Sequence, residues 1–521
     1  MVSVCVECGC VYNSTSGKTS PRGIGKMTKK PLIALVFTLL LLLSSASPSP
    51  LPASVCIIGS GIGGSSVAHF LRHYSNSNPY DAQIGQIRIF ERHGVVGGRM
   101  ATVSVAGETF EAGASILHPK NYHALEFTRL LNLTVRKPST SMSCFSLGIW
   151  DGHKFIFKTF TSDSESVIVQ SFVSLANSIK MFLRYGRSLF RMTNFVERML
   201  GKFLKYYKPF DSRPVFESVE EMLKWAGLYD LTTQTLEEEL VDAGLSPLLI
   251  QELVTVITRI NYGQSVRISG LAGAVSLAGS GGGLWSIEGG NWQMAAGLIN
   301  QSHVVLHPHT EIESLSYVSG LYELNSTEGE SYTCEVAVIA TPLDELNIHF
   351  TPGISIPERQ LQHTFTTFVR GCLNPKYFGF DMVSDIPELV GTTETPGVPF
   401  SSISVLNKHG EKDMTYKIFS RQLMPEELLN HIFSVRNETI RINWAAYPHY
   451  HAPEVFAPLI LDSKNLYYVN AFENAASTME TSAVSAENIA RLILSRLSSQ
   501  NCSGTSGLKN FCSEYQMHSD L

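Results

Sequence analysis

Val55-Cys-Ile-Ile-Gly-Ser-Gly-Ile-Gly-Gly64 decides the fold of this chain. Its apolar half predicts a strand, and a helix is predicted to follow from Ser65 to about His73. The spacing Gly59-x-Gly61-x-x-Gly64 is typical of a dinucleotide-binding turn. In such a turn the first glycine permits a tight bend, the second lets a pyrophosphate approach the backbone, and the third brings the helix against the strand. The helix N-terminus then offers free N–H groups to the phosphates.

A second predicted strand, Ile87-Arg-Ile-Phe90, strengthens this interpretation. It ends in Glu91, at the position where such folds place an acid on a ribose 2′-hydroxyl. A glycine-rich loop without a ligand is the alternative. The order strand, turn, helix and strand favours the dinucleotide site.

Three further segments identify the dinucleotide. The loop Gly94-Val-Val-Gly-Gly-Arg-Met100 allows close approach of backbone to ligand, and Arg99 offers a fork for a phosphate unless it is a plain surface arginine. The apolar run Cys334 to Pro342 predicts a buried parallel strand. Asn465 to Asn470 predicts a late strand, and Thr481 to Leu497 a helix that returns the chain to the nucleotide domain. This arrangement suits FAD. Because a second, NAD-type glycine fingerprint is absent from the sequence, molecular oxygen is the expected electron acceptor.

Length and composition indicate a globular protein with two interleaved domains. The chain has 521 residues, of which 44% are hydrophobic and 17% charged. The net charge of −6 gives no argument for a nucleic-acid partner, and nothing in the sequence indicates a protein partner. Histidines such as His307 and His449 lack the mixed clusters of a metal site, so no metal is expected.

We predict an α/β protein in which a Rossmann-type FAD-binding domain is interleaved with an α+β substrate domain. The FAD-binding parts are 54–118, 286–345 and 456–498, and the substrate-domain parts are 119–285 and 346–455. Residues 1–46 are assigned to an N-terminal extension and signal peptide, and 499–521 to a C-terminal tail.

The N-terminus has the three parts of a secretory signal. Lys29 and Lys30 precede the apolar run Leu32 to Leu43, and small residues suit cleavage after Ala46. Residues 1–26 are interpreted as an alternative start or a gene-model extension. An uncleaved membrane anchor is the alternative, although the apolar run is short for a membrane span.

Glycosylation sequons and cysteines agree with a lumenal location. Five sequons occur, at Asn132, Asn300, Asn325, Asn437 and Asn501. Nine cysteines are too few and too scattered for a disulfide scaffold. In an oxidising lumen Cys502 and Cys512 can pair, whereas Cys56 is expected to pack as a small hydrophobic residue.

The section from Ile168 to Leu204 shows helical periodicity with a wide apolar face. A second face carries a basic stripe, unless Gly186 interrupts the helix and spoils the alignment. The stripe is Lys180, Arg184, Arg187, Arg191, Arg198, Lys202 and Lys205. Either a core-packed helix with a solvated basic edge or peripheral membrane contact through 168–205 fits this pattern.

Several motifs carry a resemblance to known flavoproteins. The Gly59 fingerprint, Gly97-Gly-Arg99 and Asn470-Ala-Phe-Glu473 resemble the amine-oxidase-type flavoproteins. More narrowly, the sequence from about Ser54 to Leu497 resembles the prenylcysteine oxidase family, and the plant farnesylcysteine lyases are its closest-looking members. The family-specific runs are Ile260-Asn-Tyr-Gly-Gln-Ser265, Gly273-Ala-Val-Ser-Leu277, Gly283-Leu-Trp285, Glu288-Gly-Gly-Asn291 and Ala475-Ala-Ser-Thr-Met-Glu480.

The resemblance implies a lysosomal or vacuolar FAD thioether oxidase that acts on S-prenylcysteine with O2. Its products are a prenyl aldehyde, cysteine and hydrogen peroxide. Two departures from the amine oxidases matter: Asn470 stands where glycine is usual, and the stretch from Asn470 to Val484 has no cysteine for covalent flavin attachment. Noncovalent FAD is therefore expected. The expected cofactor-binding residues are Gly59, Ser60, Gly61, Gly63, Gly64, Glu91, Arg92, Gly98, Arg99, Ile312, Glu473, Met479 and Glu480.

Such a substrate needs an apolar tunnel and polar groups for its cysteine head. Section 168–204 is a candidate for the tunnel wall. Arg267 or Arg441 is a candidate for the carboxylate, with a structural ion pair as the alternative for each. The sequence assigns no catalytic base. An amine or polyamine oxidase and a non-catalytic lumenal lipid-binding glycoprotein remain as alternative functions.

Overall fold

The computed structural model describes residues 52–77, 80, 82–136, 146–162 and 166–504. The expected signal peptide and extension therefore lie outside the described residues, as does the part of the tail that carries Cys512. The described chain belongs to one compact unit that begins at Leu51.

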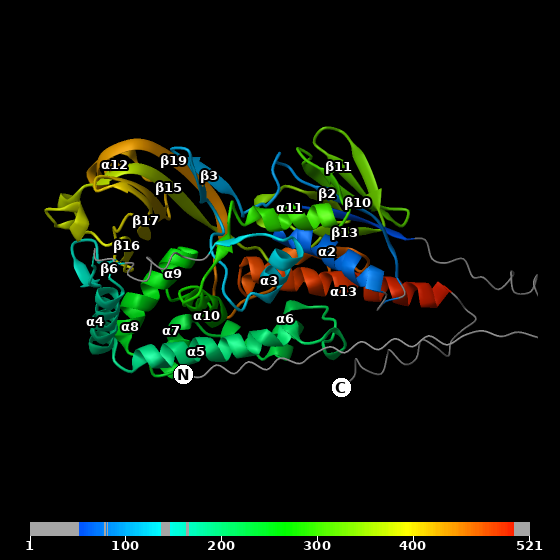
Figure 1. The fold of residues 1–521 in the computed structure, drawn as a ribbon. Coiled ribbons are helices and arrows are strands. Elements are labelled where there is room, and N and C mark those ends of the chain that lie inside the picture. Colours follow the sequence, from blue (N-terminus) through cyan, green and yellow to red (C-terminus); the bar gives the residue numbers. More distant parts are fainter. Residues whose placement is uncertain (1–51, 78–79, 81, 137–145, 163–165, 505–521) are drawn as a thin grey trace, which may run out of the picture. The chain divides into compact units, whose positions relative to one another are not determined.

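A parallel sheet of five strands carries the glycine-rich turn (Figure 1). Its order is β20-β13-β1-β2-β9, and each pair of neighbours is parallel. The strands are β1 (Ala53–Ile58), β2 (Ile84–Phe90), β9 (Val305–His307), β13 (Val336–Ile339) and β20 (Leu466–Tyr468). The predicted buried parallel strand and the predicted late strand are thereby confirmed as β13 and β20, next to each other in the sheet.

Three helices pack beside this sheet. They are α2 (Ile62–Ser77), α11 (Trp292–Gln301) and α13 (Met479–Gly504), and α2 contacts both of the others. Segments far apart in sequence thus form one nucleotide-binding layer (Figure 1). The helix predicted from Ser65 begins earlier, at Ile62, because Gly63 and Gly64 form its first turn.

A smaller sheet of four strands, order β12-β11-β10-β14, adjoins the parallel sheet. It consists of β10 (Ile312–Val318), β11 (Leu321–Ser326), β12 (Ser331–Cys334) and β14 (His349–Thr351). Cys334 forms a disulfide with Cys56 of β1, with Cα atoms 5.9 Å apart. The expectation that Cys56 packs as an unpaired hydrophobe is therefore wrong. Sequence could not reveal the pairing, since 278 residues separate the two cysteines.

The remaining large sheet has seven strands in the order β19-β15-β18-β17-β16-β6-β7. It unites the two segments assigned to the substrate domain. The strands are β6 (Leu147–Trp150), β7 (Phe155–Lys158), β15 (Leu361–Leu373), β16 (Leu389–Thr392), β17 (Ser402–Gly410), β18 (Asp413–Ser420) and β19 (Phe433–Pro448), with helix α12 (Glu426–Ile432) before β19.

Helices dominate between Tyr122 and Ala278. They are α3 (Tyr122–Leu130), α4 (Val167–Tyr185), α5 (Ser188–Phe203), α6 (Val219–Ala226), α7 (Leu236–Asp242), α8 (Pro247–Leu249), α9 (Thr255–Tyr262) and α10 (Gly270–Ala278). Two further antiparallel pairs are formed by short strands, β3 (Thr102–Val105) with β4 (Glu108–Glu111) and β5 (Val135–Arg136) with β8 (Ser286–Ile287). Within the described ranges, no helix combines the length and apolar character needed to span a bilayer.

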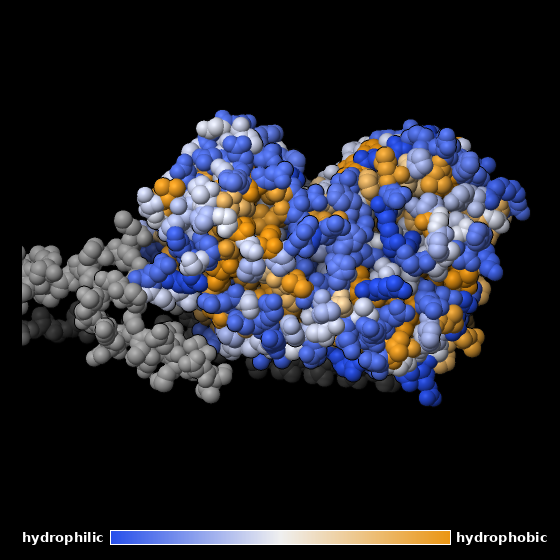
Figure 2. Space-filling view, turned by 180° about the vertical axis from the view of Figure 1, so that it is seen from behind, coloured by the Kyte–Doolittle hydropathy of each residue, from blue (hydrophilic) through white to orange (hydrophobic). Residues whose placement is uncertain are grey.

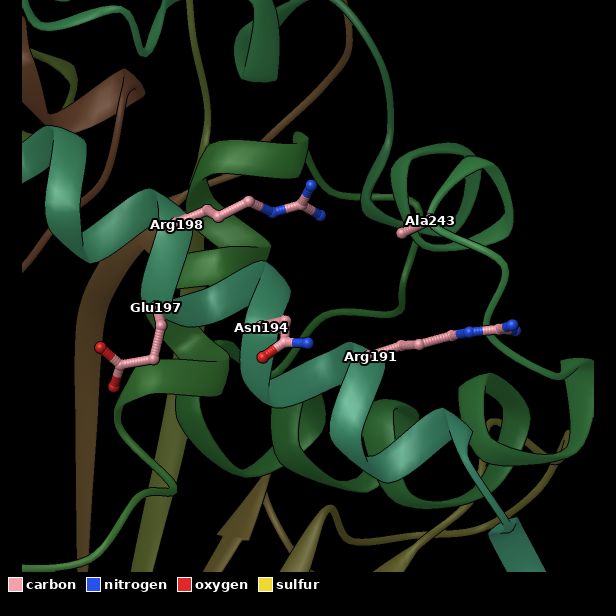
Figure 3. A pocket seen from close by; sticks show the side chains of 5 residues that line it. All are labelled: Arg191, Asn194, Glu197, Arg198 and Ala243. Atoms are coloured by element: carbon pink, nitrogen blue, oxygen red, sulfur yellow. The ribbon is translucent and has the colours of Figure 1, made fainter.

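Gly186 divides the predicted amphipathic section into α4 and α5, because it ends α4 with a φ of +59°. The basic stripe is divided with it. Lys180 and Arg184 belong to α4, whereas Arg191 and Arg198 extend from α5 toward the segment that carries Ala243 (Figure 3).

Candidate cofactor and substrate site

Two glycines of the fingerprint are fixed by packing. Gly59 has a φ of +109°, and a Cβ there would lie 2.7 Å from the carbonyl oxygen of Ala340. A Cβ on Gly64 would overlap the carbonyl oxygen of Gly59. These positions explain the tight turn and the close approach of α2 to β1.

Gly61 differs from Gly59 and Gly64 because a Cβ at this position would have no close contact. A Cβ there would meet only Gly97 and Gly98, with the carbonyl oxygen of Gly97 at 3.7 Å. Gly59 and Gly61 line a cavity of about 650 Å³ at the end of β1, whereas Gly64 does not. A larger side chain at position 61 would extend into this space. The glycine therefore leaves room for a bound pyrophosphate.

Glu91 directly follows β2 and lines the same cavity, as expected for a ribose-binding acid. The carboxylate is buried and accepts hydrogen bonds from the Ser60 hydroxyl at 2.5 Å and the His93 N–H at 2.9 Å. Arg92 is exposed at the rim, and Ile312 lies at the start of β10.

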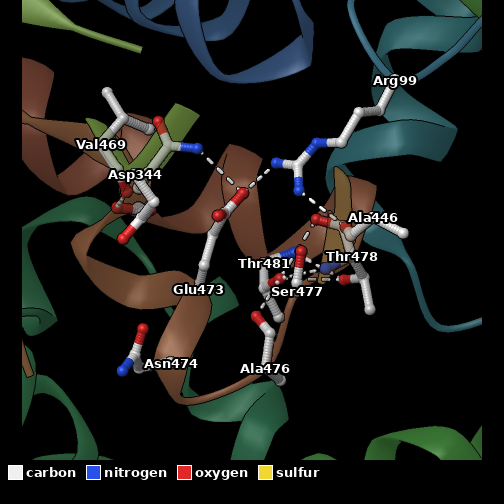
Figure 4. Close-up of polar contacts among 12 residues, drawn as sticks. Arg99, Asp344, Ala446, Val469, Glu473, Asn474, Ala476, Ser477, Thr478 and Thr481 are labelled. Carbon is white, nitrogen blue, oxygen red and sulfur yellow. Dashed lines mark hydrogen bonds and ion pairs between the residues drawn. The ribbon is translucent and has the colours of Figure 1, made fainter. Parts of the chain in front are cut away.

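Arg99 connects the Gly-Gly-Arg loop to the late segment of the chain (Figure 4). Its guanidinium forms an ion pair with Glu473 and donates to the carbonyl of Ala446 at 2.9 Å. Burial alone would raise the pKa of Glu473, but Arg99 and Arg359 together hold it below its ordinary value. Arg99 is therefore held by protein groups, and its contact with a phosphate stays a prediction.

Asn470, which replaces the usual glycine, also lies in this network. Its amide donates to Glu473 at 2.8 Å, while no residue that the structure describes hydrogen-bonds to its buried Oδ1. Because Asn470 lines the cavity, that unpaired oxygen is available to a donor on a ligand.

Most of the expected cofactor residues come together in the cavity. Those that line it are Gly59, Ser60, Gly61, Gly63, Glu91, Arg92, Gly98, Arg99, Ile312 and Met479. Three others lie behind or beside it. Gly64 packs against β1, Glu473 holds Arg99, and Glu480 accepts hydrogen bonds from the N–H groups of His123 and Ala124 at the start of α3.

Sequence reasoning missed a buried pair of titratable groups behind the wall formed by residues 112–114. The Lys417 ammonium donates to the Glu111 carbonyl at 2.9 Å and to the Ser115 hydroxyl at 3.1 Å. Burial raises the pKa of Glu111 to about 7 and lowers that of Lys417 to about 8. No motif marks Lys417, and only the register of β18 shows that it points inward.

A second cavity, of about 190 Å³, adjoins the first. Both are lined by Ala114, Asn261, Tyr447, Ser477, Thr478 and Met479. Beyond this junction the second cavity is mostly apolar. Its apolar lining includes Ile116, Leu117, Met199, Leu200, Phe203, Leu204, Val275 and Leu284. The end of α5 thus supplies part of a wall, within the section expected to do so.

The run 260–291 surrounds the junction. Asn261 lines both cavities and donates to the Ser276 carbonyl at 2.8 Å. Tyr262 packs edge-on against Tyr447. Asn291 donates to the Ala114 carbonyl at 2.9 Å and so fixes the 112–114 wall from behind.

The two candidate carboxylate-binding arginines lie elsewhere. Arg441 forms an ion pair with Glu426 on the rim of the large sheet, as its structural alternative predicted. Arg267 is exposed in the loop before α10. Neither arginine lines either cavity. Among the described residues, no group of three or more His, Cys, Asp or Glu side chains is placed to hold a metal ion.

The parallel sheet and the glycine-rich turn define a Rossmann-type α/β architecture. Residues 57–131 match the NAD(P)-binding Rossmann-like domain model. Solved structures of a redesigned putrescine oxidase and of cyclohexylamine oxidase from Brevibacterium oxydans each superpose with a TM-score of 0.55 over 86% of this chain. These superpositions cover 100% and 99% of the two structures, at 12% and 17% sequence identity, so they show the shared fold.

Residues 168–504 match the prenylcysteine lyase family model, and the chain belongs to that family. It is 62% identical to the farnesylcysteine lyase of Arabidopsis thaliana over 90% of this chain and 93% of that protein. It is 33% identical to prenylcysteine oxidase 1 of Homo sapiens, over 91% and 96% of the two chains. The resemblance inferred from the sequence motifs is confirmed.

Proposed function

We propose that this chain is an FAD-dependent thioether oxidase that cleaves S-prenyl-L-cysteine, with farnesylcysteine as the preferred substrate. The substrate, O2 and water give a prenyl aldehyde, L-cysteine and hydrogen peroxide. One observation carries the proposal: a glycine-lined cavity suited to a dinucleotide opens directly onto an apolar cavity suited to an isoprenoid chain.

FAD bound in the larger cavity would supply a hydride acceptor for the allylic, sulfur-bearing carbon of the substrate. The chain contributes binding and orientation. Leu200, Phe203 and Val275 bury the isoprenoid and exclude water, which places the thioether at the junction beside Asn261 and Thr478. Behind the adjoining wall, burial raises the pKa of the Glu111 carboxyl to about 7 and lowers that of the Lys417 ammonium to about 8.

The FAD is proposed to be noncovalent, since none of the residues that line the larger cavity is a cysteine. We expect the flavin to remain in solution when the protein is precipitated with acid. Yellow colour that stays with the precipitate would contradict noncovalent binding without affecting the assigned reaction.

A location in the secretory pathway, in the lysosome or vacuole lumen, is part of the proposal. The buried Cys56–Cys334 disulfide supports it, because such bonds persist in oxidising compartments. The sequon asparagines Asn132, Asn300 and Asn437 are exposed. N-terminal sequencing of the mature protein should find residue 47 at the end, and a mature end upstream of residue 40 would contradict the signal peptide.

Peroxide release tests the activity. The purified protein should release hydrogen peroxide with farnesylcysteine and remain inactive with putrescine and cyclohexylamine. Gly61→Val should abolish flavin binding and turnover, since the new side chain would occupy the cradle, whereas Gly410→Val, at an uncrowded exposed glycine, should preserve both. Activity on amines alone would favour an amine oxidase, and failure of the wild-type protein to take up FAD would indicate a non-catalytic role.

A further inference from the structure

The outer face of α4 is apolar and exposed. Side chains with exposed fractions from 45% to 79% follow one another along it, the largest at Leu183. At about 100° per residue, they occupy roughly a 100° sector of the helix. They are Ile168, Phe172, Leu175, Ile179, Phe182 and Leu183. We call this set the α4 face.

The other side of α4 attaches the helix to the protein. Tyr185 is buried, and Met181 packs against two of the core clusters. The α4 face therefore points away from the core. It is extended onto α5 by Phe190, whose ring contacts that of Phe182 and is itself 63% exposed. Figure 2 shows hydrophobic residues at several places, among hydrophilic ones, on the face of the molecule that it presents. A contiguous apolar helix face of this kind marks an interaction surface.

A basic groove lies along one edge of the α4 face. This groove, of about 690 Å³, is formed by α4, β7 and residues 378–380, and Leu183 belongs to both the groove and the face. Its charged lining consists of Lys154, Lys158, Lys180 and Arg184, and no aspartate or glutamate that the structure describes lines it.

Aromatic rings hold two of these ammonium groups in place. Lys180 Nζ donates to the Lys158 carbonyl at 2.5 Å and lies 4.3 Å from the ring centre of Phe160. Lys158 Nζ lies 4.3 Å from the ring centre of Phe380. Positive charge is thus fixed beside the apolar face, and among the described residues Arg184 alone of these four has a carboxylate partner, Glu252.

We propose that the α4 face docks this protein onto an anionic phospholipid bilayer. The apolar side chains would enter the boundary between headgroups and acyl chains, and the groove would receive lipid phosphates. Charge decides between the occupants. A second copy of the chain brings the same basic edge and offers no complement at this place, whereas anionic headgroups do.

This inference deepens the proposed function and rests on it in one respect. A prenylated amino acid partitions into bilayers, and α5, which follows α4 directly, provides Met199, Leu200 and Phe203 to the apolar cavity. Docking through α4 would therefore bring the substrate-binding helix pair to the phase that holds the substrate.

Vesicle flotation of the purified full chain, without substrate, tests the docking. The wild-type protein should float with phosphatidylcholine vesicles containing phosphatidylserine at least tenfold more than with pure phosphatidylcholine vesicles, and high salt should weaken this binding. The double variant Phe172→Asp/Leu183→Asp should lose at least tenfold. The matched control Val318→Asp/Val435→Asp, at exposed apolar residues on other elements, should bind as wild type.

A second measurement does not depend on a disruptive variant. Phe172→Trp should shift its fluorescence to the blue with anionic vesicles and be quenched by lipids brominated in the acyl chain. Peroxide release from dispersed farnesylcysteine without vesicles should be the same for wild type and Phe172→Asp/Leu183→Asp, so a failed oxidase assignment is distinguished from failed docking. Equal flotation of the double variant and wild type, or no flotation of wild type, would overturn the proposal. A dimer abolished by the same double variant would assign the face to a second copy instead.

Discussion

The two adjoining cavities are built on opposite principles. The larger one is bounded in part by the backbone of Gly59, Gly61, Gly97 and Gly98, and a Cβ at Gly59 or Gly97 would lie 2.7 or 2.5 Å from a carbonyl oxygen. The smaller one is bounded by side chains from α5, α10 and the segment before α3. A ligand that approaches the backbone closely requires glycines at fixed spacing. A cavity lined by side chains requires only that those side chains be apolar.

This difference separates the tolerance of the two cavities to substitution. In the larger cavity one added methyl group at the wrong glycine strikes a carbonyl oxygen. In the smaller cavity many apolar combinations preserve the wall, and the shape that they leave sets which chain fits. The cofactor class is therefore a property of few residues, and the substrate preference of many.

The largest effect is expected within the fingerprint itself. Gly64→Val should prevent accumulation of soluble folded protein, because its Cβ would overlap the Gly59 carbonyl oxygen, at a cost of about 3 kcal/mol or more. Gly61→Val should remain folded and lose only the flavin. Circular dichroism and flavin absorbance separate the two outcomes. A folded, yellow Gly64→Val protein would refute the packing role.

The ion network behind the cradle should give the next largest effect. Glu473→Ala leaves Arg99 and Arg359 without their shared buried carboxylate, and should lower the free energy of unfolding by about 3–5 kcal/mol. Glu426→Ala is the matched control, since Glu426 also serves two arginines but is exposed, and should cost less than about 1 kcal/mol. Urea denaturation measures both, and equal losses would mean that burial of the network is unimportant.

Much of the nucleotide-binding half could be predicted from the sequence, because its strands are continuous apolar runs and its turn has a glycine code. The cavity lining could not, since Lys417 and Val275 carry no local pattern that distinguishes them from core residues. The Cys56–Cys334 bond was mispredicted for a related reason: the antiparallel pairing of β11 with β12 brings Cys334 into the core, and that arrangement is not encoded near Cys56.

Substitutions in the apolar cavity should change substrate binding and leave flavin binding unaffected. Val275→Trp should fill it and displace about one isoprene unit, which costs about 2 kcal/mol of burial and raises KM for farnesylcysteine about 30-fold. Flavin content should not change, and a substrate with a shorter prenyl chain should be less affected. Val318→Trp, at an exposed valine on β10, is the control. An unchanged KM would place the isoprenoid elsewhere and remove the main support for assigning the smaller cavity to the prenyl chain.

The smallest effect concerns the wall between the cavities. Burial raises the pKa of Glu111 to about 7, so the folded state holds a proton that the unfolded chain releases near pH 4.5. Glu111 therefore makes the protein less stable as the pH rises from about 4.5 to about 7, by up to about 1.4 kcal/mol per pH unit. Glu111→Gln keeps an oxygen for the Asn291 N–H and should flatten this slope in urea titrations at pH 5, 6 and 7. Glu108→Gln, on the same strand but more exposed, should retain it. A slope that survives in Glu111→Gln would assign the proton to another group and mean that the Glu111 carboxyl is ionised throughout this range.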